Sequence, residues 1–164
     1  MIKRPRITRS SGRSRPLPPS RTALPLSRTF THDEYIALAL GYKPRSPLEK
    51  WFIFMEDETL FFHRAQTGSC IFEAPLARSA ENVTLRAAQV NREPQQYRST
   101  DDEYDAALLN YLIDRFLLGR WVPLPLPRDM PREHADRHRR HVIGDADNSG
   151  DSIRLRLNTD GSDL

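Results

Sequence analysis

The chain has 164 residues and a net charge of +3, but its charges are unevenly distributed. Residues 1–28 contain eight Lys and Arg side chains and no acid, whereas residues 29–123 contain ten basic and fourteen acidic side chains. A single cysteine excludes an intramolecular disulfide framework and fits a reducing compartment. No signal peptide is recognisable and no apolar run approaches the roughly 18 residues of a membrane span, so we expect a cytoplasmic protein with no membrane partner.

The first 28 residues are rich in Arg, Ser and Pro and lack aromatic side chains. A segment of this composition buries too little apolar surface to offset the entropy lost on ordering, so residues 1–28 are predicted to be a disordered tail. Two interpretations of this tail stay open. It is either a plain solvated leader or a basic arm that binds an acidic protein or nucleic acid.

A short helix is predicted where the folded part begins. Thr31 and Glu34 have the spacing of a capping box, in which each side chain accepts a hydrogen bond from the backbone N–H of the other residue. Apolar residues follow, and Gly41 suits a helix C-terminus, so we expect a helix over residues 32–40. Two prolines then make residues 43–47 an irregular connector.

Three or four strands are predicted after this connector. Residues 51–55 are apolar at both alternating positions, which indicates a central strand that is covered on both faces. Further strands are expected over residues 60–65, 69–74 and 82–87, and Pro75 should end the third strand or mark a sheet edge. Because the connections between these runs are short, we expect an antiparallel meander.

A long helix is predicted to follow the strands. Thr100 and Glu103 repeat the capping-box spacing, and apolar residues over a wide arc continue to Gly119. We expect this helix to pack across the sheet. The fold class is therefore α+β, with a short N-terminal helix, a three- or four-stranded antiparallel meander and a long C-terminal helix in one domain over residues 29–123.

Residues 124–164 are predicted to form a mostly disordered polar tail. Four prolines, at positions 123, 125, 127 and 131, argue against a continuing helix, and the end of the chain is rich in Asp. The alternating residues 152–157 are an exception that would suit an added sheet-edge strand. His134, His138 and His141 have a spacing that suggests a metal, but they lack a fourth ligand and lie among arginines, so no metal site is expected.

The stretch FFHRAQTGSCIF, residues 61–72, places polar residues between apolar ends. A two-residue turn at residues 67–68 would pair His63 with Phe72 and make Cys70 a diagonal neighbour of His63 on the same face. One interpretation is a Cys–His nucleophile. The interpretation that we favour is an ordinary buried cysteine, because no acidic third group lies nearby in the sequence.

Arg64 lies inside a predicted strand, where a guanidinium needs an acid, an aromatic face or an anionic ligand. One interpretation is a structural ion pair with one of three acids, Glu56, Glu58 or Glu73. The other is an anion clamp in which Thr67 and the Gly68 amide lie beside Arg64. Both interpretations stay open.

A polar loop is predicted over residues 90–97, between the sheet and the long helix. Loops on rigid scaffolds often carry binding residues, so Asn91, Arg92 and Tyr97 are candidates to complete a polar pocket with Arg64. The alternative is structural: Asn91 caps a turn and the Tyr97 ring packs against the core.

Two segments, KWFIFMEDETLFFHRAQTGSCIF and VNREPQQYRSTDDEYDAALLNYLI, carry a detailed pattern. This pattern resembles a small bacterial domain family of uncharacterised function, with K-W-F-I, E-D, L-x-F-H-R-S-W-T-G, C-I, V-N-R and D-x-E-Y-D-x-x-L-L over about residues 30–118. The resemblance implies an association with ADP-ribose-handling proteins or with bacterial accessory and defence loci. Ala65 and Gln66 stand where the family usually has Ser-Trp, which puts any ligand contact from those two positions in doubt. The residues that keep the pattern are Arg64, Thr67, Gly68, Asn91 and Arg92.

Three hypotheses for function follow. The first is a small ligand-binding or accessory module that binds an anionic, nucleotide-like small molecule without a further cofactor. The second is an interaction protein whose basic arm, residues 1–28, binds an acidic protein or nucleic acid. The third is an enzyme that uses His63 with Cys70 or Asn91, although the sequence identifies no catalytic residue. The candidate ligand-binding residues are His63, Arg64, Thr67, Gly68, Asn91, Arg92 and Tyr97.

Overall fold

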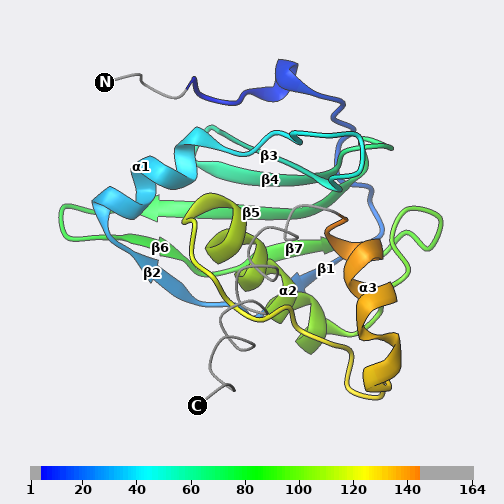
Figure 1. Ribbon diagram of the computed structural model, residues 1–164. Helices are drawn as coiled ribbons and strands as arrows, with labels where there is room; N and C mark the ends of the chain where they lie inside the picture. The colour runs from blue at the N-terminus through cyan, green and yellow to red at the C-terminus, as the bar shows by residue number, and fades with distance from the viewer. Residues whose placement is uncertain (1–4, 145–164) are drawn as a thin grey trace, which may run out of the picture.

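The computed structural model describes residues 5–144 (Figure 1). These residues form an antiparallel sheet with helices, so the α+β class is confirmed. The strands are β1 (Arg21–Leu24), β2 (Arg28–Phe30), β3 (Trp51–Glu56), β4 (Thr59–Arg64), β5 (Cys70–Arg78), β6 (Val83–Leu85) and β7 (Ala88–Asn91). The α-helices are α1 (His32–Leu40), α2 (Asp102–Leu112) and α3 (Ala135–Val142), and α2 continues as a π-helical turn over Ile113–Leu117. Short 3₁₀ turns occur at Arg9–Ser11 and Arg132–His134.

The sheet is larger than the sequence predicts. Within the described residues it has seven strands, in the order β1-β7-β5-β4-β3, and β6 and β2 extend it from the far end of β5. The prediction of three or four strands is therefore wrong, because β1, β2 and β7 are short and obtain their stability from partners distant in sequence. No helix among residues 5–144 has the length and apolar character needed to cross a membrane.

Strand β5 continues through Pro75 instead of ending there. Its first half pairs with β7 up to Glu73, and its second half pairs with β6 from Leu76 onward. Pro75 lies between these two stretches, where a strand can tolerate the missing backbone N–H.

Strand β3 lies at one edge of the five-strand path, so its predicted central position is wrong. The prediction that both of its faces are covered is confirmed, because Trp51 to Met55 are all buried. Trp51, Ile53 and Met55 belong to the main core, on the face of β3 that α1 covers, whereas Phe52 and Phe54 face the opposite side. The apolar pattern reflects the burial of both faces of the strand. A strand at the edge of a sheet can also be covered on both faces, so the pattern does not indicate a central position.

On this opposite face, β3 and β4 are covered by residues 5–16, which we call the N-terminal strap (Figure 1, blue). Its backbone is tied at both ends, from Ile7 N to Leu40 O at 2.8 Å and from Arg15 N to Gly68 O at 2.7 Å. The Arg9 guanidinium lies 4.9 Å from the centre of the Phe54 ring. The strap thus replaces water over an aromatic surface.

The prediction that residues 1–28 are disordered is therefore wrong for residues 5–28. After the strap, Leu17 is buried and β1 pairs with β7 along its whole length. Leu24 and Leu26 are also buried. A few leucines and a set of backbone pairs suffice to order the segment, since the rest of the fold supplies the apolar surface that the segment itself lacks.

Helix α1 matches the sequence prediction. The Thr31 hydroxyl accepts a hydrogen bond from Glu34 N at 3.1 Å, and the Glu34 carboxylate accepts one from Thr31 N at 2.9 Å. Gly41 follows the helix with φ of 72°, a conformation that favours glycine. The capping box predicted for the second helix is wrong, because Asp101 is the N-cap of α2 and accepts from Tyr104 N at 3.1 Å. A carboxylate at this position also interacts favourably with the helix dipole.

Part of the C-terminal region is ordered, which corrects the prediction of a tail over residues 124–164. Helix α3 ends at Val142, and Val142 and Ile143 are buried. The Trp51 indole N–H donates to Val142 O at 2.7 Å, which fixes the end of α3 to the sheet. The strand predicted for residues 152–157 lies outside the described residues.

Candidate ligand-binding site

The stretch FFHRAQTGSCIF forms the end of β4, a loop over residues 65–69 and the start of β5. The predicted two-residue turn is wrong: Arg64 N donates to Ser69 O at 2.9 Å, and Gly68 N donates to Arg64 O at 2.7 Å. A register shift between Phe62 and His63 makes His63 pair with Cys70 instead of Phe72. Such irregularities turn neighbouring side chains toward different surroundings.

His63 and Cys70 are buried as neutral groups. The His63 ring stacks on Phe54 with centroids 5.3 Å apart, and its Nε2 lies 3.2 Å from Arg15 O in the strap. Burial lowers the pKa of His63 to about 4 and raises the pKa of the Cys70 thiol to about 12. Because a nucleophilic cysteine needs the thiolate, the geometry favours the ordinary buried cysteine.

Thr67 and Gly68 shape the loop beside the strap. The Thr67 hydroxyl accepts a hydrogen bond from Ser69 N at 3.2 Å. Gly68 has φ of 77°, and a Cβ atom added there would lie 3.0 Å from Arg13 Cβ. The Gly68 amide is already bonded to Arg64 O, so this pair does not form an anion clamp with the Arg64 side chain.

The Arg64 side chain lies on the face that carries α3. Its guanidinium lies 5.2 Å from the centre of the Trp51 ring, and it donates to His141 O and Val142 O, both at 2.9 Å. Two of its five N–H groups are thus used at the C-terminus of α3, where carbonyl oxygens carry partial negative charge. Two of the three acids proposed as its partners are engaged elsewhere, since Glu56 pairs with Arg9 and Glu58 with Arg78. No ion pair joins the third, Glu73, to Arg64 in the described part of the chain.

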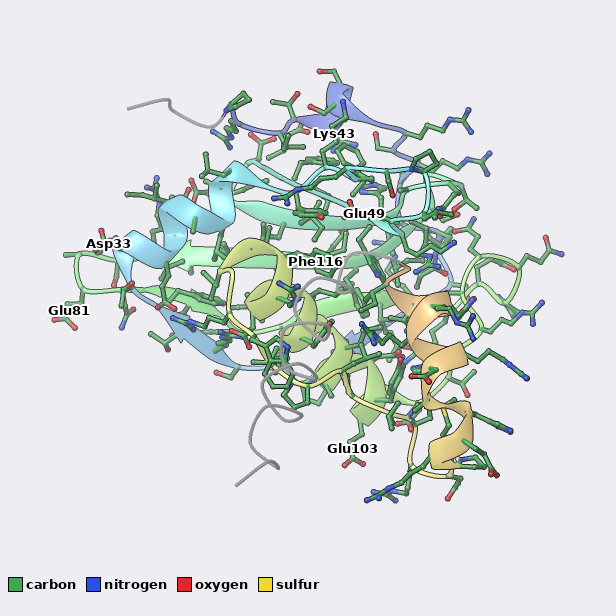
Figure 2. The ribbon with its side chains drawn as sticks, viewed as in Figure 1. Asp33, Lys43, Glu49, Glu81, Glu103 and Phe116 are labelled. Carbon is green, nitrogen blue, oxygen red and sulfur yellow. The ribbon has the colours of Figure 1, made fainter. Side chains whose placement is uncertain are left out.

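A pocket of about 660 Å³ opens beside Arg64, and we call it the Arg64 pocket. Trp51 and Arg64 come from the sheet, residues 94–101 form the loop wall, and helices α2 and α3 close the remaining sides. In Figure 2 the labelled Glu103 marks the first turn of α2, with α3 beside it. The side chains used in the argument below are Trp51, Arg64, Tyr97, Arg98, Tyr104 and His138.

Asn91 lies behind this pocket and is fully buried at the end of β7. Its amide donates to Cys70 O and to Gln96 Oε1, both at 2.8 Å, and its oxygen accepts from Glu93 N at 2.7 Å. The structure thus places Asn91 in the strand that precedes the loop, where it holds the loop backbone. Residues 90–91 belong to β7, so the loop begins later than predicted.

Arg92 and Tyr97 are joined through a buried carboxylate. Arg92 forms ion pairs with Asp105 at 2.6 Å and with Asp102 at 2.5 Å, and it donates to Ser99 O at 3.0 Å. The Tyr97 hydroxyl donates to Asp105 at 2.5 Å, and Tyr97 also lines the Arg64 pocket. Of the seven predicted residues, the structure therefore brings Arg64 and Tyr97 together in the pocket, with Asn91 and Arg92 behind it.

The pocket contains residues that the sequence did not assign to it: Tyr104, and two of the histidines considered above only as metal ligands. His138 and His141 come from α3, and the Tyr104 hydroxyl lies 2.8 Å from His138 Nε2. Burial lowers the pKa of both histidines. Their three-residue spacing places them on one helix face, a signal that applies only if the segment is helical. Among residues 5–144, no group of three His, Cys, Asp or Glu side chains is arranged to hold a metal ion.

Comparisons of the chain with models of known protein families, with curated proteins and with solved structures found no match. The family resemblance over about residues 30–118 therefore stays a prediction.

Proposed function

We propose that the Arg64 pocket binds an anionic small molecule with a planar ring, of the nucleotide or ADP-ribose type. The observation that supports this most directly is the guanidinium of Arg64, which lines a pocket beside three aromatic side chains. Two of its N–H groups bind α3, and the other three are without a partner in the described part of the chain. An anionic oxygen is the strongest acceptor for such donors.

The charges around the pocket favour an anion. Arg98 is exposed, lines the pocket and forms no ion pair with another described residue. The acid among the lining residues, Asp101, caps α2 through its bond from Tyr104 N. Asp105, behind the pocket, is neutralised by Arg92. Among the charged lining residues, the two positive charges of Arg64 and Arg98 thus outnumber the single carboxylate of Asp101.

The aromatic side chains suit a planar ring. Trp51, Tyr97 and Tyr104 line the pocket, and rings of this kind stack on nucleobases at about 1–3 kcal/mol per base. The two residues that depart from the family pattern, Ala65 and Gln66, are not among the lining residues. Gln66 instead donates to Pro47 O at 3.1 Å. Replacement of Ser-Trp at these positions therefore leaves the chemistry of the Arg64 pocket intact.

Isothermal titration calorimetry of the full chain with ADP-ribose, AMP, NAD and inorganic phosphate tests the proposal. We expect the ring-bearing anions to bind more tightly than phosphate, and Arg98→Ala to weaken that binding by about tenfold, the loss of one charge-assisted contact. Arg86→Ala is the matched control, because Arg86 is exposed, lies between β6 and β7 and lines neither this pocket nor the others found.

A second variant separates charge from geometry. Arg64→Lys keeps the positive charge but removes the planar set of donors, so it should weaken the ligand while thermal melting checks that α3 remains docked. If none of the ring-bearing anions binds, or if Arg98→Ala and Arg86→Ala bind equally well, the proposed ligand class is wrong.

A further inference from the structure

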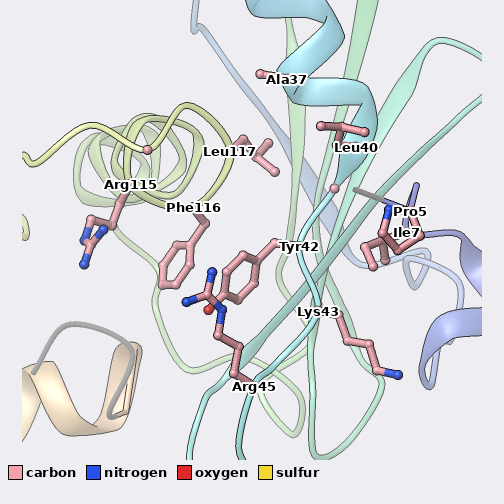
Figure 3. Close-up of a pocket in the computed structure, with 12 residues that line it drawn as sticks. Pro5, Ile7, Ala37, Leu40, Tyr42, Lys43, Arg45, Arg115, Phe116 and Leu117 are labelled. Atoms are coloured by element: carbon pink, nitrogen blue, oxygen red, sulfur yellow. The ribbon is translucent and has the colours of Figure 1, made fainter. Parts of the chain in front are cut away.

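A second cavity of about 510 Å³ lies at the other end of the molecule's helical layer, between α1, the connector after it and the π-helical turn (Figure 3). It shares no lining residue with the Arg64 pocket. We call it the Arg45 cavity. Pro5 and Ile7 of the strap complete its wall, so its shape depends on the segment predicted to be disordered.

One part of the Arg45 cavity is cationic. Lys43, Arg45 and Arg115 line it, and no acidic residue is among the lining residues. Lys43 and Arg45 are exposed, and their side chains form no hydrogen bond or ion pair with another described residue. The nearest carboxylate in this region, Glu49, is buried and accepts hydrogen bonds from the Tyr42 hydroxyl at 2.9 Å and from the backbone N–H of Arg45.

The other part of the cavity is apolar. Leu40 and Leu117 approach from α1 and the π-helical turn, and the Tyr42 and Phe116 rings meet edge to face with centroids 4.8 Å apart. In Figure 3 the Arg45 side chain extends toward these two rings. A cationic rim beside an apolar wall matches a molecule that has both an anionic group and an apolar chain.

We propose that the Arg45 cavity binds an amphipathic anion, namely an acyl chain that ends in a carboxylate or phosphate group. The chain lies against Leu40, Leu117 and the aromatic pair, where its apolar surface is removed from water. The anionic group binds the Arg45 guanidinium through charge-assisted hydrogen bonds. This site is independent of the ligand proposed for the Arg64 pocket.

Octanoate is the probe. Acetate keeps its carboxylate without the long chain, and 1-octanol keeps the chain without the negative charge. Titration calorimetry of the full chain should show octanoate binding at least tenfold more tightly than either one. Each pair of methylenes added to the carboxylate should tighten binding by roughly tenfold. Equal affinity for acetate and octanoate, or for octanol and octanoate, would overturn the proposal.

Two variants test the two halves of the cavity. Arg45→Glu should weaken octanoate binding by tenfold or more, whereas Arg86→Glu makes the same charge change away from the cavity and should leave it unchanged. Ala37→Phe fills the apolar part from the partly exposed face of α1 and should also weaken octanoate, with thermal melting as the check on folding. Octanoate binding that is unaffected by both variants contradicts the site.

Two further experiments identify the source of the anion and show which of the two pockets binds octanoate. Sedimentation with anionic lipid vesicles that is lost in Arg45→Glu would assign the acyl chain to a bilayer lipid, whereas octanoate binding without sedimentation would assign it to a free carboxylate. Arg98→Ala should leave octanoate binding unchanged. Loss of octanoate binding in that variant would place octanoate in the Arg64 pocket and overturn the assignment to the Arg45 cavity.

Discussion

His63 shows how a residue flagged for chemistry can be structural. Its side chain lies between the sheet and the strap, in contact with the Phe54 ring, and only 1 % of the residue's surface is exposed. Its Nε2 lies near Arg15 O, and Nδ1 is buried without a hydrogen-bond partner among residues 5–144. A ring in these surroundings is stable only without charge, because the contact with Arg15 O does not offset the loss of hydration.

The buried imidazole predicts a dependence of stability on pH. Burial lowers the pKa of His63 from an ordinary value of 6.5 to about 4, so between these values the unfolded chain binds a proton that the folded chain does not. Stability should therefore be retained above pH 7 and fall as the pH drops, by about 2 kcal/mol between pH 7.5 and pH 5 from this residue alone. Urea unfolding at the two pH values measures this loss.

The variant His63→Phe keeps an aromatic ring and cannot take up a proton. The difference in unfolding free energy between pH 7.5 and pH 5 should shrink in this variant, while the contributions of other titrating groups remain. If the variant and the parent chain have the same pH dependence of unfolding free energy, the pKa of His63 is not lowered by its burial.

At the scale of elements, the strap shows that a polar segment can be part of the core. The Arg9 side chain covers Phe54 and Phe61, with its guanidinium 4.9 Å and 5.2 Å from the two ring centres, and forms an ion pair with Glu56 at 2.7 Å. Gly12 lies against Phe52, since an added Cβ would approach that ring to 2.9 Å. The Arg9 side chain and the backbone at Gly12 thus cover aromatic rings, although neither residue has an apolar side chain.

Removal of residues 1–16 should therefore destabilise the protein, although it leaves β1 in place. We expect a loss of about 3 kcal/mol, the cost of exposing one or two phenylalanine side chains, and increased binding of a hydrophobic dye. Thermal and urea unfolding measure the loss. Gly12→Val is a milder test that must displace Phe52 or the strap, and melting temperatures equal to that of the parent chain in both cases would rule out a structural role for the strap.

For the whole molecule, the basic side chains of residues 5–28 are part of the folded surface. Arg28 pairs with Asp114 at 2.6 Å, and Arg21 donates to Leu17 O at 2.6 Å. Arg13 and Arg15 remain exposed beside the loop that follows β4. The hypothesis of a basic arm that binds an acidic partner or nucleic acid stays a prediction, and these two fixed side chains are where it is best tested.

Substitution is a cleaner test of this hypothesis than truncation, because truncation of residues 1–28 would remove β1. If the basic segment binds nucleic acid, retention of single-stranded or duplex DNA in a filter assay should fall steeply with salt. Arg13→Gln with Arg15→Gln should then reduce the slope of log K against log salt concentration by about two, since each phosphate contact contributes about one. Absence of retention at low salt, with the parent chain folded, argues against this partner.

Local signals located the Arg64 pocket only in part. Arg64 and Tyr97 are candidates from local sequence alone. An arginine inside a strand needs a partner for its charge, and a tyrosine in a polar loop beside a rigid scaffold is a common binding residue. The partners of Arg64 lie 77 and 78 residues away in α3. Tyr104 and His138 are not assigned to the pocket from sequence for the same reason, since no local pattern brings α2 and α3 together.

Helix α1 with its capping box, the run of strands from β3 to β5 and the α+β class follow from local sequence patterns, because caps, turns and alternation are interactions between near neighbours. The tertiary structure decided the edge position of β3, the register of His63 with Cys70, and the order of the strap, β1 and α3. Those outcomes depend on which distant surfaces meet, and a short polar segment becomes ordered only where the rest of the fold offers it backbone partners and apolar area to cover.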